Sequence, residues 1–176
     1  MDKVDQRKRN EIFQNRVKQF ELKAGSFIIN CFPTSIWENT LYKAWSDILG
    51  RIIRNNLKIK ELLGKYALAT QVDDVALFEK NTFLCISSFN NKNIKDNERY
   101  ENICGVMKKF RNTCRMEGKK FNNFLIKNMG TIYYYEEFEK STYIMVVSSN
   151  KKTSLELIKI NIQIIKQKFN DVINKK

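Results

Sequence analysis

From residue 55 onward the apolar residues alternate between helical and strand-like patterns, and this order constrains the fold more than any other sequence feature. Two runs rich in β-branched and aromatic residues flank the short turn Glu79-Lys80-Asn81, a pattern that predicts a β-hairpin. Helical spacing comes before this hairpin and returns after it. The predicted elements are a helix ending near Thr70, strands at 72–78 and 82–89, a helix at 98–116, strands at 121–126, 131–135 and 142–147, and a final helix after Thr153.

This order predicts an antiparallel five-stranded sheet with helices on its faces, an α+β architecture, because hairpins and a meander join the strands. In the final helix, Thr153-Ser154-Leu155-Glu156 fits a capping box. Apolar residues follow a strict 3-4 spacing at Leu155, Ile158, Ile162, Ile165, Phe169 and Val172. Leu157, Ile160 and Ile164 make the apolar face wider than one sheet contact requires. A second partner surface is therefore an alternative to a purely internal role.

The first 54 residues have a different character. Helical spacing over about 4–24 is followed by the nearly continuous apolar run 27–32, typical of a strand covered on both faces in a parallel α/β sheet. Ser35-Ile36-Trp37-Glu38 fits a capping box and opens a helix that continues to Ile52. We therefore divide the chain into an α/β segment, 1–54, and a separate domain, 55–176.

Composition excludes several classes of function. The formal charge is +13, but the lysines are scattered and no helix-turn-helix or zinc-finger pattern occurs, so we expect no nucleic-acid partner. The chain has four cysteines without a C-x-x-C pair and no histidine, which argues against a zinc site and against Ser-His or Cys-His catalysis. No apolar run approaches the length of a transmembrane helix.

Four segments in the same order carry a resemblance to a known family: 34–46, which holds both tryptophans, 73–84, the pair 99–103 and 108–110, and 141–147. They resemble the Rag small GTPases of nutrient signalling, A/B branch (the Gtr type in yeast), and the resemblance spans nearly the whole chain. It implies that residues 55–176 form a roadblock-type domain and that 1–54 are the end of a Ras-like G domain. The element order from 55 onward also matches the roadblock fold, with a longin domain as the second choice.

The resemblance also assigns guanine-binding positions. Asp2 falls on the aspartate that accepts hydrogen bonds from guanine, and Ser35 and Ile36 fall on the loop beside the base. Solvation of Asp2 and helix capping by Ser35 are the alternatives. No G-x-x-x-x-G-K-[ST] pattern occurs in the chain, and without a P-loop we expect neither a Mg²⁺ site nor GTP hydrolysis by this chain alone. GTP or GDP is the cofactor that the family implies.

Because Met1 falls on an internal methionine of the family's motif, we expect the sequence to be shortened relative to the family. A start at an internal ATG and a naturally shortened paralogue both remain open. In either case we expect weak hydrogen-exchange protection over 1–50 and cooperative folding of 55–176.

The helix at 98–116 carries a candidate interface. Ile103, Met107, Phe110 and Cys114 follow a 4-3-4 spacing, which fits either packing on the helix's own sheet or, by the roadblock resemblance, a dimer interface formed by Ile103, Met107 and Phe110. The family implies a heterodimer with a C/D-type Rag subunit, a cytoplasmic location on the lysosomal or vacuolar membrane through a scaffold complex, and recruitment of the TOR kinase complex. A nucleotide-independent roadblock adaptor is the rival interpretation.

Overall fold

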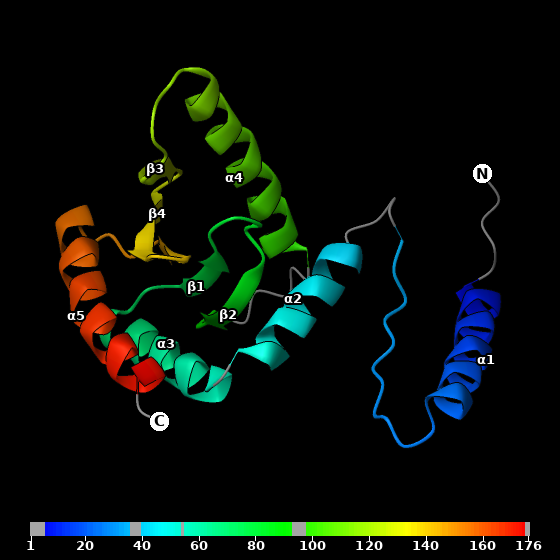
Figure 1. The fold of residues 1–176 in the computed structure, drawn as a ribbon. Coiled ribbons are helices and arrows are strands. Elements are labelled where there is room, and N and C mark those ends of the chain that lie inside the picture. The colour runs from blue at the N-terminus through cyan, green and yellow to red at the C-terminus, as the bar shows by residue number, and fades with distance from the viewer. Residues whose placement is uncertain (1–5, 36–39, 54, 93–97, 175–176) are drawn as a thin grey trace. The chain divides into compact units, whose positions relative to one another are not determined.

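The computed structural model describes residues 6–35, 40–53, 55–92 and 98–174 (Figure 1). The chain divides into two compact units, Met1–Ala44 and Trp45–Lys176. The unit boundary lies within a helix, about ten residues before the domain boundary predicted from the sequence. The assignment of 1–54 to a G domain stays a prediction.

The N-terminal unit holds the helix α1, Gln6–Ala24, which ends where Gly25 adopts a positive φ of 60°. The predicted strand at 27–32 is wrong, because these residues have no regular secondary structure. Phe27 and Ile28 are 80% and 95% exposed. A strand needs a hydrogen-bonded neighbour, and no described strand pairs with this segment. A continuous apolar run therefore did not suffice to make a strand.

The helix α2, Thr40–Ile52, confirms the second predicted helix. Most of the predicted capping box, residues 36–38, and Trp37 lie outside the described residues. Trp45 is 53% exposed, whereas Leu49 packs against the core of the C-terminal unit. The side-chain amide of Asn56 donates to the Gly50 carbonyl oxygen at 2.7 Å and ties the end of α2 to the next helix.

The C-terminal unit has the predicted element order. The described strands form one sheet in the order β2-β1-β5-β4-β3, with every neighbouring pair antiparallel. The elements are α3 (Asn56–Thr70), β1 (Asp74–Glu79), β2 (Cys85–Asn90), α4 (Arg99–Met116), β3 (Asn123–Asn128), β4 (Thr131–Glu139), β5 (Thr142–Ser148) and α5 (Leu155–Asn174). The five-stranded antiparallel sheet confirms the predicted α+β class.

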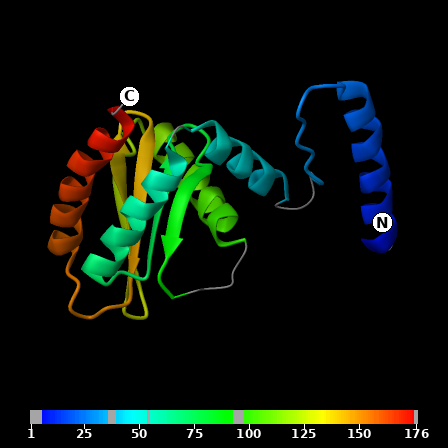
Figure 2. The same cartoon turned by 90° about the horizontal axis from the view of Figure 1, so that it is seen from below.

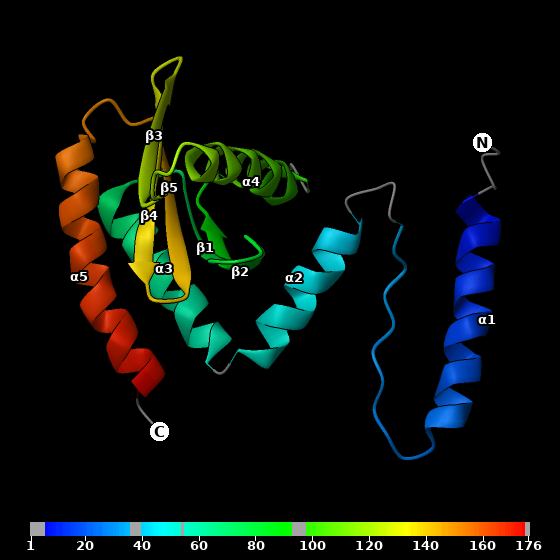
Figure 3. The same cartoon turned by 45° about the horizontal axis from the view of Figure 1, so that its top comes forward.

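Helices cover both faces of this sheet, with α3 and α5 on one face and α4 on the other (Figures 2 and 3). The central strand β5 is buried along its whole length, and its side chains alternate between the faces. Ile144 and Val146 enter the core under α3 and α5. Tyr143 and Met145 point to the α4 face, where Tyr143 contacts Phe83 and Phe121. Two apolar layers therefore share one sheet.

Several predicted bounds needed adjustment, and β1 and β3 each begin two residues later than predicted. Residues 82–84 lie in the β1–β2 turn rather than in a strand, because the Glu79 carboxylate accepts hydrogen bonds from the Asn81 and Thr82 amides. Helix α5 is capped by Ser154 instead of Thr153, since the Ser154 hydroxyl accepts from the Leu157 amide at 3.2 Å. All four cysteines are free. Cys104 is buried, and the other three are partly buried as whole residues.

Candidate functional site

The predicted guanine-binding residues can be only partly located. Asp2 and Ile36 lie outside the described residues. Ser35 is half-buried, and its backbone N–H donates to the Thr40 hydroxyl oxygen at 2.8 Å. This contact fixes the turn that leads into α2. A role of these three residues in binding guanine stays a prediction.

The three predicted interface residues of α4 occupy different depths. Met107 is fully buried against the sheet, and Ile103 is half-buried beside it. Phe110 is 45% exposed, and its ring lies 5.6 Å from those of both Phe121 and Phe124. These three residues therefore pack α4 on its own sheet, and at Phe110 they also reach the surface. Participation of these residues in a dimer interface remains a prediction.

An apolar cavity of about 200 Å³ opens where α4 crosses the sheet near β3. Met107 and Ile103 form part of its wall, together with side chains that the helical spacing did not single out. The most exposed of these is Val106, at 52%. The additional apolar residues of the wall are Val106, Phe124, Ile126, Tyr133, Tyr134, Tyr135 and Met145. Only the tertiary structure brings them together, because they come from four separate elements.

Strand β3 forms the edge of the sheet next to this cavity. In the part of the chain that the structure describes, β3 pairs only with β4. Leu125 and Ile126 are 38% and 42% exposed although they point to opposite faces of the strand. An exposed edge strand with apolar side chains is a template for pairing with another chain. We call the cavity and the neighbouring edge strand together the α4–β3 surface.

A buried polar cluster holds the start of α4 on the sheet. Arg99 Nη2 lies 2.5 Å from Asp74 Oδ2, and the Tyr100 hydroxyl donates to Asp74 Oδ1 at 3.0 Å. Burial raises the pKa of Asp74 to about 6, an effect that Arg99 and the Tyr100 hydrogen bond oppose. Burial also raises the pKa of the neighbouring Cys85 thiol to about 12, so this thiol stays protonated and unreactive at neutral pH.

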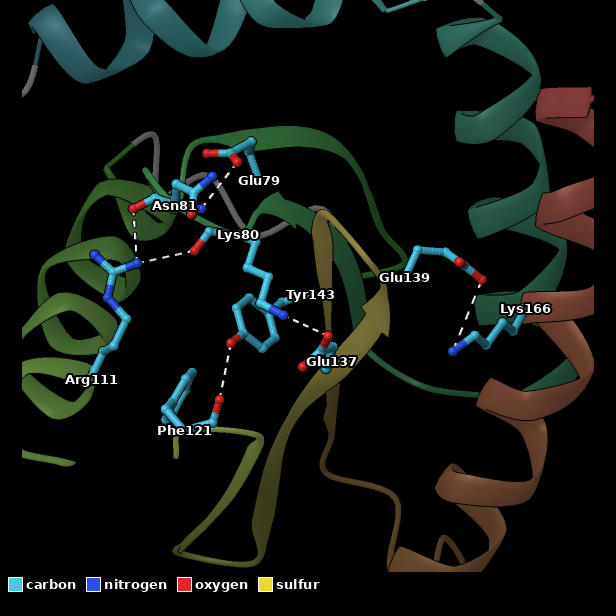
Figure 4. A network of polar contacts seen from close by, with 9 residues as sticks. All are labelled: Glu79, Lys80, Asn81, Arg111, Phe121, Glu137, Glu139, Tyr143 and Lys166. Carbon is cyan, nitrogen blue, oxygen red and sulfur yellow. Dashed lines mark hydrogen bonds and ion pairs between the residues drawn. The ribbon is translucent and has the colours of Figure 1, made fainter. Parts of the chain in front are cut away.

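A second set of polar contacts holds the other half of α4, at the opposite end of the sheet (Figure 4). Arg111 donates to the carbonyl oxygens of Lys80 and Asn81 in the β1–β2 turn, and its guanidinium lies 4.5 Å from the centre of the Phe83 ring. The Tyr143 hydroxyl donates to the Phe121 carbonyl oxygen at 3.1 Å. With both ends fixed, α4 presents the apolar surface in a defined position.

The described residues offer a surface suited to protein binding. Among them, no three histidine, cysteine, aspartate or glutamate side chains lie close enough to share a metal ion. None of the described helices is long and apolar enough to cross a membrane. The clearest candidate for a binding surface is the α4–β3 surface, which combines the outer edge of β3 with a cavity that can accept a partner's side chains.

Comparison with known sequences identifies relatives over almost the whole chain. A family model described as the Gtr1/RagA G protein conserved region matches residues 1–107. Ras-related GTP-binding protein A of Dictyostelium discoideum is 34% identical over 99% of this chain and 58% of its own length. Ras-related GTP-binding protein B of Rattus norvegicus is 33% identical over 96% and 45%, respectively. GTP-binding protein gtr1 of Schizosaccharomyces pombe is 30% identical over 93% and 54%. The chain thus spans about half the length of these curated relatives.

Solved structures share the fold of the C-terminal unit. Myxococcus xanthus MglB superposes with a TM-score of 0.55 at 18% identity, over 68% of this chain and 97% of that protein. A Roadblock/LC7 domain from Streptomyces avermitilis gives a TM-score of 0.50 at 9% identity, over 64% of this chain and 94% of that domain. These likenesses confirm the roadblock-type fold predicted from the element order.

Proposed function

The chain belongs to the Gtr1/RagA family of G proteins, and we propose that residues 55–176 are the dimerisation module of a Rag-type GTP-binding subunit. The observation that carries this proposal is the α4–β3 surface. Val106 and Phe110 are about half exposed on the helix, and Leu125 and Ile126 are partly exposed on the edge strand. Apolar side chains grouped at an open sheet edge are stabilised when a partner covers them.

The geometry supports pairing through backbone and side chains together. A partner strand aligned with β3 would satisfy its outward-facing N–H and C=O groups, and a partner helix beside α4 would cover Val106 and Phe110. Fully burying an apolar side chain of this size stabilises a complex by about 1.5–3 kcal/mol. A second domain of the same fold can supply both elements. We therefore propose a C/D-type Rag subunit as the partner.

The proposal extends to signalling through the family. A heterodimer of this kind would dock on a scaffold complex at the lysosomal or vacuolar surface and recruit the TOR kinase complex when amino acids are available. The alternative is an adaptor that dimerises through the same surface without binding nucleotide. Guanine-nucleotide binding separates the two functions.

Nucleotide titration is the test that distinguishes subunit from adaptor. Asp2, Ser35 and Ile36 would contact the base, but these 176 residues contain no P-loop pattern to hold the phosphates. We expect GTP binding weaker than micromolar and no hydrolysis by these 176 residues alone. The adaptor gives the same result, so tight binding is the outcome that separates the two functions. Binding of GTP at micromolar concentration or tighter would exclude the adaptor.

The dimer surface is tested by charge substitution. We expect Val106→Glu and Ile126→Glu each to weaken the complex with a C/D-type subunit at least about tenfold, measured by analytical ultracentrifugation, because each places a charge in an apolar contact on the α4 face of the sheet. Leu68→Glu is the matched control, since Leu68 is 60% exposed on α3, on the opposite face of the sheet. An equal loss with Leu68→Glu, or no loss with either α4–β3 variant, would refute the proposed interface.

A further inference from the structure

The β3–β4 turn places a methionine where the backbone favours a different residue. The two strands are joined by Met129 and Gly130, which both have positive φ, 45° and 79°. A two-residue turn of this kind favours Asn-Gly, because a methionine in the left-handed region is sterically strained. Met129 is also 99% exposed. Strain and solvent exposure of an apolar side chain coincide at this tip, and that combination indicates a function outside the fold.

A basic turn lies beside this tip. Strands β4 and β5 are neighbours, and Ile132 pairs with Ser148, so the connections next to both residues emerge at the same end of the sheet (Figures 2 and 3). The Thr153 amide donates to the Asn150 carbonyl oxygen at 3.0 Å and closes a turn around Lys151 and Lys152. Both lysines are exposed.

The basic turn is held in place by defined contacts. The Ser149 amide donates to the Asp73 carboxylate at 2.7 Å, and the Lys152 amide donates to the side-chain oxygen of Asn150 at 3.0 Å. Lys92 pairs with the same Asp73 carboxylate at 2.9 Å. The Asp73 carboxylate is therefore occupied by contacts within the fold. Lys151 and Lys152 therefore stand at the surface on a fixed backbone.

The first turns of α5 extend the surface with apolar side chains. Leu157 and Ile160 are 43% and 59% exposed, while Ile158 faces the core. Glu156 is the acidic residue of this helix turn. Its pKa is lowered by its own backbone amide and the Ser154 hydroxyl, with smaller contributions from Lys159 and from Lys127 of β3. Lys127 pairs with Ile132, which pairs with Ser148, so Lys127 lies at this same end of the sheet.

We propose that this end of the sheet docks on a membrane surface rich in anionic lipid. The docking surface, which we call the basic tip, consists of Lys127, Met129, Lys151, Lys152, Leu157 and Ile160. Its apolar side chains would enter the headgroup region, and its lysines would meet the lipid phosphates and carboxylates. The basic tip carries three lysines against the single carboxylate of Glu156, so its charge is complementary to such a surface.

The form of the basic tip favours a membrane over a folded protein partner. Its groups lie on two protruding turns and on exposed positions of a helix, whereas the cavity lined by Ile103 and Met107 lies on the α4 face. Protruding apolar and basic side chains suit a deformable interface, because neither needs a complementary pocket. Each lysine near an anionic membrane strengthens binding by about fivefold. This inference is independent of the α4–β3 surface.

The test is vesicle co-sedimentation of the full chain. The vesicles are pure phosphatidylcholine, or phosphatidylcholine with about 30% phosphatidylserine, in buffer of low ionic strength. We expect binding that depends on phosphatidylserine. We also expect a loss of at least about tenfold in the partition coefficient with Lys151→Glu/Lys152→Glu, because two attractive charges become repulsive. Met129→Asn should cost about fivefold, because it removes an apolar side chain from the headgroup region. Met129→Asn suits the turn better than the native residue, so this variant will fold.

Matched controls separate the basic tip from the general positive charge. Lys119→Glu/Lys120→Glu changes the net charge equally, in the exposed segment before Phe121 at the other end of the sheet. Met116→Asn removes a methionine that is 90% exposed at the end of α4. We expect both controls to stay within about twofold of the native chain. Equal losses in the controls, or no dependence on phosphatidylserine, would overturn the proposal. The proposal would also be overturned if Lys151→Glu/Lys152→Glu left vesicle binding unchanged but lowered the mass of a protein complex measured by analytical ultracentrifugation. That outcome would assign the basic tip to a protein partner.

Discussion

Replacing Arg99 with methionine removes the cation from the buried cluster that holds α4 on the sheet, while leaving most of the side-chain volume in place. The side chains of Asp74 and Arg99 are 1% and 16% exposed. Loss of one partner leaves the Asp74 carboxylate without its compensating charge, and breaking a buried pair in this way costs about 3–5 kcal/mol. We expect R99M to lower the free energy of unfolding by about 3 kcal/mol at pH 8.

The pH dependence identifies the carboxylate as the cause. Burial raises the pKa of Asp74 from 3.8 to about 6, so protonation of this group stabilises the folded state, and that stabilisation is lost as the pH rises from about 4 through 6. Removing Arg99 raises the pKa of Asp74 further. Because the protonated carboxyl needs no cation, the effect of R99M should shrink to about 1 kcal/mol at pH 5.

Urea unfolding followed by circular dichroism at pH 5 and pH 8 measures both values. D74N and the double variant D74N/R99M complete a cycle, in which R99M should cost at least about 2 kcal/mol less when Asp74 is already neutral. K92M is the matched control, because Lys92 is 52% exposed and pairs with the adjacent Asp73, so its loss should cost less than about 1 kcal/mol. An R99M effect that is equal at both pH values, or additive with D74N, would refute the electrostatic reasoning.

Three further outcomes follow from packing, turn geometry and exposure. Met107 is fully buried, so Met107→Ala should lower the free energy of unfolding by about 2–4 kcal/mol, and a cost below about 1 kcal/mol in urea would show that α4 is loosely packed. Arg111→Met leaves two turn carbonyls without their donor, so we expect the free energy of unfolding to fall by about 1–3 kcal/mol and hydrogen exchange at 80–84 to become faster. Unchanged exchange there would contradict the role of Arg111. Hydrogen exchange should also be fast over 27–32, which lacks regular structure, and slow in β5; equal protection of the two segments would contradict the assignment of 27–32.

Helices and hairpins of the C-terminal unit could be predicted because their signals are local. The spacing of Ile103, Met107 and Phe110 and the turn after Glu79 each lie within a few residues of the structure that they specify. The ends of helices and strands were predicted less accurately, because competing local hydrogen bonds determine where each element stops. Glu79 binds the amides that a longer second strand would have used.

The strand predicted at 27–32 failed for the opposite reason. Its apolar composition indicates burial but does not supply a pairing partner, and strand formation depends on residues that are distant in the sequence. The same limit applied to the candidate interface. Three of its residues could be chosen from helical spacing, whereas Val106 and the β3 edge became apparent only once the strand order was known.

By itself, the sequence determined the family, the order of helices and strands, and the roadblock-type fold, because these follow from short-range patterns and matched motifs. The tertiary structure decided which groups meet. It placed Asp74 against Arg99 across 25 residues, left β3 at the sheet edge, and brought Met129 to the same end of the sheet as Lys151. Long-range strand pairing sets these contacts, and side-chain periodicity carries no information about which strands will be neighbours.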